Sequence, residues 1–122
     1  MPRIMKFKIP GIYHETDVYL VSRKYLTEKY KKLEGKKALT ADELLHGFYS
    51  HTNNIIYIAK ELAPDRRFHT FMHELVHMME DETEHLDLEN KADIVGKYIG
   101  ELFRNEEFRG HIKTIIENGR LK

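Results

Sequence analysis

Residues 73–77 of this chain read His-Glu-Leu-Val-His, and they constrain the fold more than any other stretch. The preceding residues 66–72 contain no glycine or proline and carry apolar side chains at helical spacing. We therefore expect a helix over about 66–80, with Asp65 as its N-cap. On that helix the two histidines stand four residues apart and point the same way, with about 40° between them around the axis.

The expected helix has two different faces. Apolar residues recur at intervals of three and four and predict one buried stripe, formed by Phe68, Phe71 or Met72, Leu75 and Met79. A neighbouring stripe is polar and consists of His69, His73, His77 and Glu80. The motif histidines are thus expected beside the buried stripe and not within it.

A glutamate between two histidines one helical turn apart forms the H-E-x-x-H arrangement of zinc peptidases. His73 and His77 would be two metal ligands, and Glu74 lies close enough to take a proton from a zinc-activated water. The chain has no cysteine, which excludes disulfides and thiolate zinc sites. Zinc held by histidine and carboxylate favours a catalytic site over a closed structural one, so we predict Zn²⁺ as cofactor and Glu74 as general base.

A catalytic zinc site needs a third protein ligand and an open position. The downstream candidates are Glu80, Glu82, Glu84, His85 and Glu89. Glu80 lies about 10 Å along the helix axis from His73, too far for both to bind one ion from a straight helix. The third ligand is therefore expected from a second helix, predicted over 88–104, that folds back on the first. Glu89 is our choice, and His85 is its main rival.

The face of the second helix that carries Glu89 supports this arrangement. Asp93 follows one turn later and would accept the remaining ring N–H of a ligand histidine. Gly96 and Gly100 continue the face and would let the two helices approach closely. The opposite stripe is apolar and is expected in the core; it consists of Leu88, Ala92, Val95, Ile99 and Leu102.

The rest of the chain predicts an α+β fold in a single domain, 1–122. Strand patterns at 4–9 and 12–21 suggest one hairpin, and those at 47–49 and 55–59 suggest another. Helical patterns cover 22–33, with Ser22 as N-cap, and 105–117, with a short helical turn at 42–46.

The composition of the chain limits the kinds of binding partner that can be expected. The chain has 122 residues, 41% of them hydrophobic, which suffices for the modest core of one domain. Its formal net charge is +0, so no global attraction to nucleic acid or anionic membrane is expected. No apolar run reaches the roughly 20 residues of a membrane span, and no signal-peptide apolar region opens the chain, so a cytoplasmic protein is expected. The basic segment 23–37 is interpreted as a solvated helix face, with a partner contact as the alternative.

Three segments together carry a family resemblance. Gly47-Phe48-Tyr49, then the strand 54–58, then Arg66-Arg67-Phe68 leading into the HELVH motif resemble the ImmA/IrrE family of metallopeptidases. The later segment 89–93, Glu-Asn-Lys-Ala-Asp, is similar to the segment that supplies the third zinc ligand in that family. The resemblance covers residues 47 to about 103.

The resemblance implies a minimal zincin fold, with a small antiparallel sheet packed on the motif helix and on the ligand-bearing helix. Compact members of this size are often encoded by phages and mobile elements, and members with known roles cleave DNA-binding repressors. The chain departs from the family in three ways. The loop between His77 and Glu89 is short, Val76 replaces the usual glycine before the second histidine, and nothing after residue 104 resembles the sensory domain of larger relatives.

The sequence thus predicts a zinc-dependent endopeptidase acting on a protein or peptide, with a repressor as a candidate substrate. We expect the substrate to lie extended beside an edge strand at 55–59 by strand addition. No direct nucleic-acid contact is expected, and the chain would be a monomer or weak homodimer. The alternative is an inactive binding protein of the same fold that sequesters a regulator, and the intact Glu74 argues against it.

Overall fold

The computed structural model describes residues 5–34 and 46–117. Four strands and four helices follow one another in these ranges. They are β1 (Met5–Ile9), β2 (Thr16–Val21), α1 (Arg23–Glu34), β3 (Gly47–Ser50), β4 (Ile55–Ala59), α2 (Pro64–Thr83), α3 (Leu88–Arg104) and α4 (Glu106–Glu117). The α+β class is confirmed. Most of the short turn predicted at 42–46 lies outside the described residues.

The strands form one mixed sheet in the order β1-β2-β4-β3. β1 pairs antiparallel with β2, and β3 with β4, as the two predicted hairpins require. β2 and β4 are parallel neighbours, because β3 begins at the end of the sheet where β2 finishes and runs back, so that β4 then follows the direction of β2. The prediction of an antiparallel sheet is therefore wrong at its central pair.

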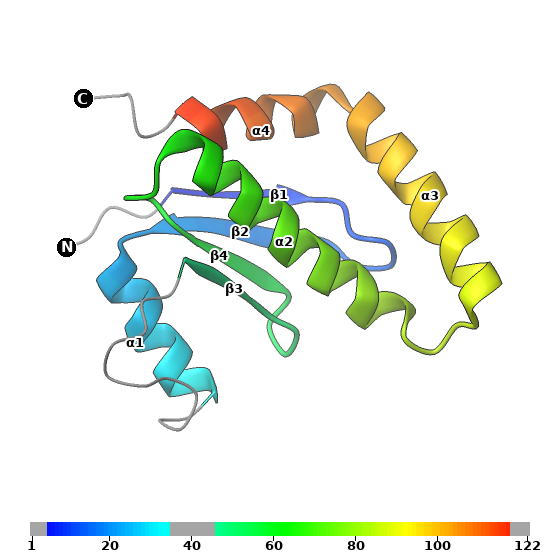
Figure 1. The fold of residues 1–122 in the computed structure, drawn as a ribbon, viewed down its shortest axis with the longest axis horizontal. Helices are drawn as coiled ribbons and strands as arrows, with labels where there is room; N and C mark the ends of the chain where they lie inside the picture. Colours follow the sequence, from blue (N-terminus) through cyan, green and yellow to red (C-terminus); the bar gives the residue numbers. More distant parts are fainter. Residues whose placement is uncertain (1–4, 35–45, 118–122) are drawn as a thin grey trace.

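Helices cover both faces of the sheet. Gly47 faces Thr70 of α2, so its neighbour Phe48 points to the opposite face, where it meets Tyr30 of α1 with ring centroids 5.1 Å apart. On the α2 side, Phe71 contacts Phe108 of α4. Figure 1 shows α2 lying across the sheet, α3 leading away from its far end, and α4 returning over its beginning.

Two helix starts show how local sequence sets the boundaries. The Ser22 hydroxyl accepts the backbone N–H of Tyr25, which confirms Ser22 as the N-cap of α1. The start of α2 differs from the prediction: Ala63 occupies the N-cap position without a side-chain hydrogen bond, and Pro64 opens the helix. Proline suits a first helical position because its missing N–H has no partner there. The proposal of Asp65 as N-cap is therefore wrong.

A buried arginine ties α4 to the start of α2. Arg67 is 0% exposed, and its guanidinium donates to backbone carbonyls at both ends of this junction. The acceptors are the carbonyls of Lys60, Leu62, Ile115 and Ile116. Since Ile115 and Ile116 lie in the last turn of α4, the cation satisfies carbonyls that the helix itself leaves unpaired.

A buried carboxylate ties the other end of α2 to the β1–β2 loop. Glu82 accepts the backbone N–H groups of Ile12, Tyr13 and His14 at 2.8, 3.2 and 3.1 Å. These interactions hold residues 12–14 in a loop, which explains why β2 begins at Thr16 and not at residue 12 as predicted. Both ends of α2 are thus fixed. None of the described helices is long and apolar enough to cross a membrane.

Candidate metal centre

The motif residues lie on α2, which packs on the sheet through its apolar face. Phe71, Leu75 and Met79 of the predicted stripe are buried, together with Met78, while Phe68 and Met72 are partly buried. His69, His73, His77 and Glu80 are all exposed on the neighbouring face, as predicted. The histidines therefore face solvent from a helix that its core contacts hold in place.

The rings of His73 and His77 converge on one point. Their Nε2 atoms are 3.2 Å apart, and the ring planes are inclined at 82°. Two ligands each about 2.05 Å from a tetrahedral zinc ion are about 3.3 Å apart. The pair therefore fits two coordination positions of one zinc ion without a change of rotamer.

Glu74 lies between the histidines in sequence but on the buried side of the helix. It is 6% exposed, and burial raises the pKa of its carboxyl to about 7, although a hydrogen bond from the backbone of Tyr49 acts in the opposite direction. A carboxyl that titrates near neutral pH can take up and release a proton under physiological conditions.

Glycine at position 47 lets β3 approach α2. A Cβ atom there would lie 2.5 Å from the Tyr57 backbone oxygen and 2.7 Å from Cγ2 of Thr70. Real carbon contacts are never so short, so a side chain at this position would push β3 away from the helix or distort its pairing with β4. The glycine thus places the Tyr49 backbone beside Glu74.

Among the described strands, β3 forms the edge of the sheet beside the motif. Ala59 donates its N–H to the carbonyl of His46, which makes these two residues a hydrogen-bonded pair. Because such pairs alternate along an antiparallel ladder, the backbone groups of Gly47 and Tyr49 point away from β4. The prediction of an edge strand at 55–59 is wrong, since β4 lies between β2 and β3.

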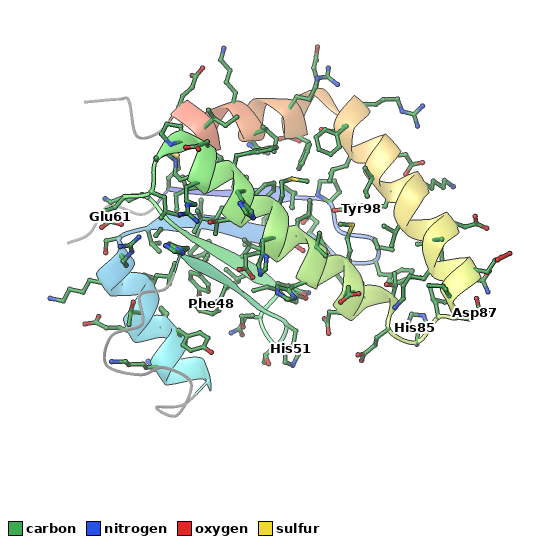
Figure 2. The ribbon with its side chains drawn as sticks, viewed as in Figure 1. Phe48, His51, Glu61, His85, Asp87 and Tyr98 are labelled. Carbon is green, nitrogen blue, oxygen red and sulfur yellow. The ribbon has the colours of Figure 1, made fainter. Side chains whose placement is uncertain are left out.

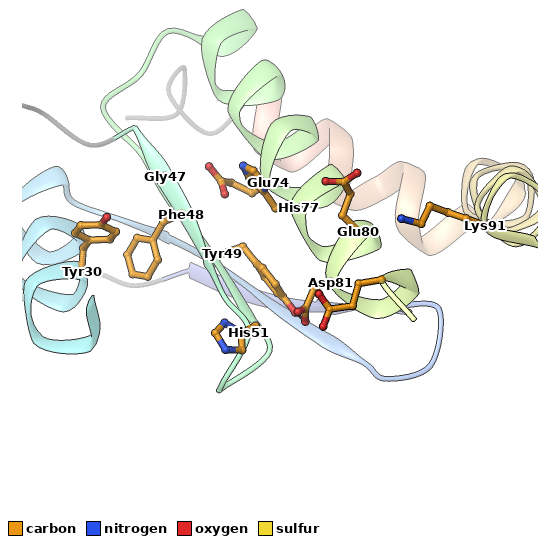
Figure 3. A pocket seen from close by; sticks show the side chains of 11 residues that line it. Tyr30, Gly47, Phe48, Tyr49, His51, Glu74, His77, Glu80, Asp81 and Lys91 are labelled. Atoms are coloured by element: carbon orange, nitrogen blue, oxygen red, sulfur yellow. Dashed lines mark hydrogen bonds between the residues drawn. The ribbon is translucent and has the colours of Figure 1, made fainter. Parts of the chain in front are cut away.

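Two cavities meet at the motif. One, of about 590 Å³, is lined by Glu74 and His77 and continues to Glu84, and Figure 3 shows it between β3 and α2. The other, of about 290 Å³, is lined by His73 and Glu74 and continues to Arg66. Both share Gly47 and Glu74, so they form one groove along β3 and α2, which we call the β3–α2 groove.

The candidate third ligands on α2 have different surroundings. Glu80 and Glu84 line the same cavity as His77. Glu82 is occupied by the three backbone N–H groups of the β1–β2 loop. His85 lies beyond the end of α2, with its ring 6.0 Å from that of Tyr13, and Figure 2 shows it at the α2–α3 turn.

Glu89 and Asp93 are exposed on α3 and are not brought to the histidines. The residue of α3 that lines the cavity is Lys91, and Glu89 lies about 160° from it around the helix. Asp93 lies on the same helix face as Glu89, and it is therefore also about 160° around the axis from Lys91. In the described ranges, no three side chains of the metal-binding types come close enough to hold an ion.

The predicted packing of α3 is also different. Leu88 is 83% exposed and Ile99 38% exposed, and only Tyr98 and Leu102 of this helix are buried. Gly96 and Gly100 face open space, with no atom within 4 Å of a Cβ built there. The expectation that this stripe forms core is therefore confirmed for Leu102, holds in part for Val95, and is wrong for Leu88, Ala92 and Ile99. The Tyr98 hydroxyl instead donates to the carbonyl of Pro10.

Sequence reasoning missed the contribution of β3 to the site. The amide of Tyr49 meets Glu74, but a backbone group leaves no signal in a sequence. The Tyr49 hydroxyl donates to Asp81 at 3.0 Å. Gly47 was a usable signal, since glycine in a short strand indicates close approach of another backbone or helix.

Comparison with protein-family models, with curated proteins and with solved structures finds no match to this chain. The functional argument therefore depends on the geometry of the site.

Proposed function

We propose that this protein is a zinc-dependent endopeptidase. The observation that carries the proposal is the convergence of the His73 and His77 Nε2 atoms, 3.2 Å apart, above the buried carboxyl of Glu74. The free edge of β3 runs beside these three residues. Two ligand imidazoles, a base and a docking edge for an extended peptide are elements that a zinc metallopeptidase requires besides a third protein ligand.

His73 and His77 would hold the ion. A bound zinc ion supplies Lewis acidity, which lowers the pKa of a water molecule and polarises a peptide carbonyl. Glu74 would act there as the general base, holding a proton on its carboxylate and releasing it to the leaving amine. In the metal-free protein burial raises the pKa of this carboxyl to about 7, and a bound dication would lower it toward the ionised form that a base requires. The Tyr49 amide keeps the carboxylate in position between the two steps.

The substrate binds extended along β3. The backbone groups of Gly47 and the carbonyl of Tyr49 face the groove, while the Tyr49 N–H is already donated to Glu74, so a peptide can add to the sheet as a fifth strand through the remaining groups. This places its backbone next to Glu74, because the groove is lined by β3 on one side and α2 on the other.

Glu89 remains our proposal for the third ligand, and it requires α3 to turn. The exposed stripe of α3 and the 48% exposed Val76 on α2 give this rearrangement an apolar surface to bury. Asp93, on the same face as Glu89, would then reach a ligand histidine. Glu80 and Glu84 are the rivals already in the groove.

The proposed activity agrees with the resemblance to the ImmA/IrrE family. By the same resemblance, we propose that the protein is a compact peptidase of the type encoded by phages and mobile elements. By that resemblance, a DNA-binding repressor is the candidate substrate, with no direct contact between the enzyme and nucleic acid.

Metal analysis and one variant test the proposal. Protein prepared without a histidine tag should contain one zinc per chain, and Glu74→Gln should keep the zinc. Cleavage of fluorescein-labelled casein, or of repressors encoded by neighbouring genes, should fall by roughly 10² or more in this variant. Glu101→Gln, an exposed change on α3, is the matched control and should retain activity. Protein that cannot be loaded with zinc, or an unimpaired Glu74→Gln, would overturn the proposal.

The second candidate is a binding protein of the same fold that sequesters a regulator. It is favoured by the position of α3, which leaves only two of the expected ligands together. The two candidates differ in the same experiment, since a sequestering protein binds the repressor and leaves it intact.

A further inference from the structure

The β3–α2 groove carries opposite charges at its two ends. Its walls are continuous past Glu74, because the two cavities share that residue and Gly47. One end is lined by the start of α2 and the other by its last turns. Because the charge changes sign along the length of the groove, an extended ligand lying in it would meet opposite charges at its two ends.

The end at the start of α2 is positive. Arg66 and His69 line it together with His46. Partial burial lowers the pKa of His46, and the charges of Arg23 and Arg66 lower it further, so both arginines act on this end of the groove. The Nε atom of Arg23 is buried and has no hydrogen-bond partner among the described residues. The charge at this end is therefore arginine charge, and His46 is neutral at pH 7.

The end at the last turns of α2 is negative. Glu80, Asp81 and Glu84 line it, with Lys91 of α3 as the cation on the same wall. Figure 3 shows Glu80 and Asp81 on the α2 side, opposite Tyr49 of β3. Asp81 accepts the Tyr49 hydroxyl at 3.0 Å, and its charge contributes to the raised pKa of that tyrosine. Among the residues that the structure describes, carboxylates thus outnumber the ammonium group at this end.

The direction of β3 fixes the direction of a bound peptide. β3 begins at Gly47, beside the positive end, and leads to His51, which lines the negative end. Antiparallel pairing is the more stable kind, and a peptide paired with β3 in this way runs from the negative end of the groove to the positive end. The amino-terminal part of the peptide then lies at the carboxylates and its carboxyl-terminal part at Arg66.

We propose that the groove selects peptides with basic residues before the scissile bond and acidic residues after it. This inference rests on the proposed function and adds the substrate class to it. Arg66 is the specificity-determining residue for the carboxyl-terminal side, and Glu80 and Glu84 are those for the amino-terminal side.

Helix and strand rises give the positions of these charges. Arg66 is eight residues from Glu74, about 12 Å along the helix, which matches about four residues of extended peptide. Glu80 and Glu84 lie about 9 and 15 Å from Glu74, or about three to five peptide residues on the other side.

Two peptide libraries test the charge preference. Each has four randomised central residues, flanked by two lysines before and two aspartates after the centre in one library, and by the reverse order in the other. Zinc-loaded protein should cleave the first library about tenfold faster, since each exposed charge contact contributes a few-fold. The preference should shrink in 1 M NaCl, where the screening length falls to about 3 Å. A preference for the reverse order would overturn the proposed direction.

Single charge reversals locate the preference. Arg66→Glu should remove most of the discrimination at the aspartate side, and Glu84→Lys should do so at the lysine side. Arg104→Glu, an exposed arginine at the end of α3, is the matched control and should keep the full preference. Equal preferences in the Arg66→Glu and Arg104→Glu variants would overturn the role of Arg66.

Binding separates this inference from the proposed activity. Fluorescently labelled peptides of both orders are titrated into Glu74→Gln protein, and the lysine-first peptide should bind about tenfold tighter. Charge-selective binding without cleavage by the parent protein would leave the groove assignment standing and refute the peptidase. Cleavage without any charge preference would refute the groove assignment and leave the peptidase standing, and no binding of either peptide would overturn the inference.

Discussion

α2 and α3 are the two helices that the sequence expects to share one metal ion, yet they are held very differently. α2 buries eight residues, which come from its whole length: Arg67, Thr70, Phe71, Glu74, Leu75, Met78, Met79 and Thr83. α3, nearly as long, buries only Tyr98 and Leu102. The Arg67 and Glu82 contacts also fix both ends of α2 to other parts of the chain.

The difference teaches where the site is preorganised. The two histidines and Glu74 are positioned by core packing, so their geometry does not depend on a ligand. The third ligand, if α3 supplies it, comes from an element with few packing contacts, which can change position at a lower free-energy cost. Metal binding would then supply the free energy that orders α3.

Zinc affinity gives the largest expected effect. Glu89→Ala should lower the affinity by several orders of magnitude, because it leaves two imidazoles as the only ligands. Asp93→Ala should lower it by roughly 10- to 100-fold, since it removes only a partner of a ligand histidine. His85→Ala should have little effect. Titration of the variants against a competing chelator gives the ranking.

Two outcomes of that titration would break the comparison between the helices. A larger loss in Glu80→Ala or Glu84→Ala than in Glu89→Ala would show that α2 alone builds the site. A larger loss in His85→Ala would indicate a site of three histidines.

Two leucines measure the packing difference directly. Leu75 is 0% exposed, so Leu75→Ala should lower the free energy of unfolding by about 2–5 kcal/mol. Leu88 is 83% exposed, so Leu88→Ala should change it by less than about 0.5 kcal/mol in metal-free protein. Urea unfolding with and without zinc sharpens the comparison. A cost of Leu88→Ala that appears only with zinc would show that α3 packs on α2 when the ion binds.

The pH dependence of stability gives the smallest expected effect. Burial raises the pKa of Glu74 from 4.5 to about 7, so the folded protein keeps a proton there that the unfolded chain releases. Stability is therefore lost as pH rises from about 4.5 to about 7. Glu74→Gln avoids this loss, and its melting temperature in metal-free protein should exceed that of the parent by several degrees at pH 8 and by nothing at pH 4.

Glu80→Gln is the control for this prediction, because it removes an exposed carboxylate from the same helix. An equal gain in both variants at pH 8 would show that the effect comes from the net charge of α2 and not from the burial of Glu74.

The sequence indicated the elements well where a pattern is local. The apolar period of α2, the Ser22 cap and the two hairpins depend on neighbouring residues, and all are present in the structure. The sequence was a poor guide to features that depend on contacts between segments far apart in the chain. The parallel pairing of β2 with β4 and the exposed stripe of α3 are of this kind, since an apolar stripe shows that a helix can be buried but not against what.

By itself the sequence determined that the two motif histidines lie together, because helix geometry places His73 and His77 on one face whatever surrounds them. Only the tertiary structure decided the surroundings of Glu74. Its burial, which raises the pKa, depends on the packing of β3 beside α2, which Gly47 allows, while the Tyr49 amide of the same strand acts on the pKa in the opposite direction. Side-chain direction on a helix is a local property, whereas the burial of a carboxyl depends on which distant segments pack around it.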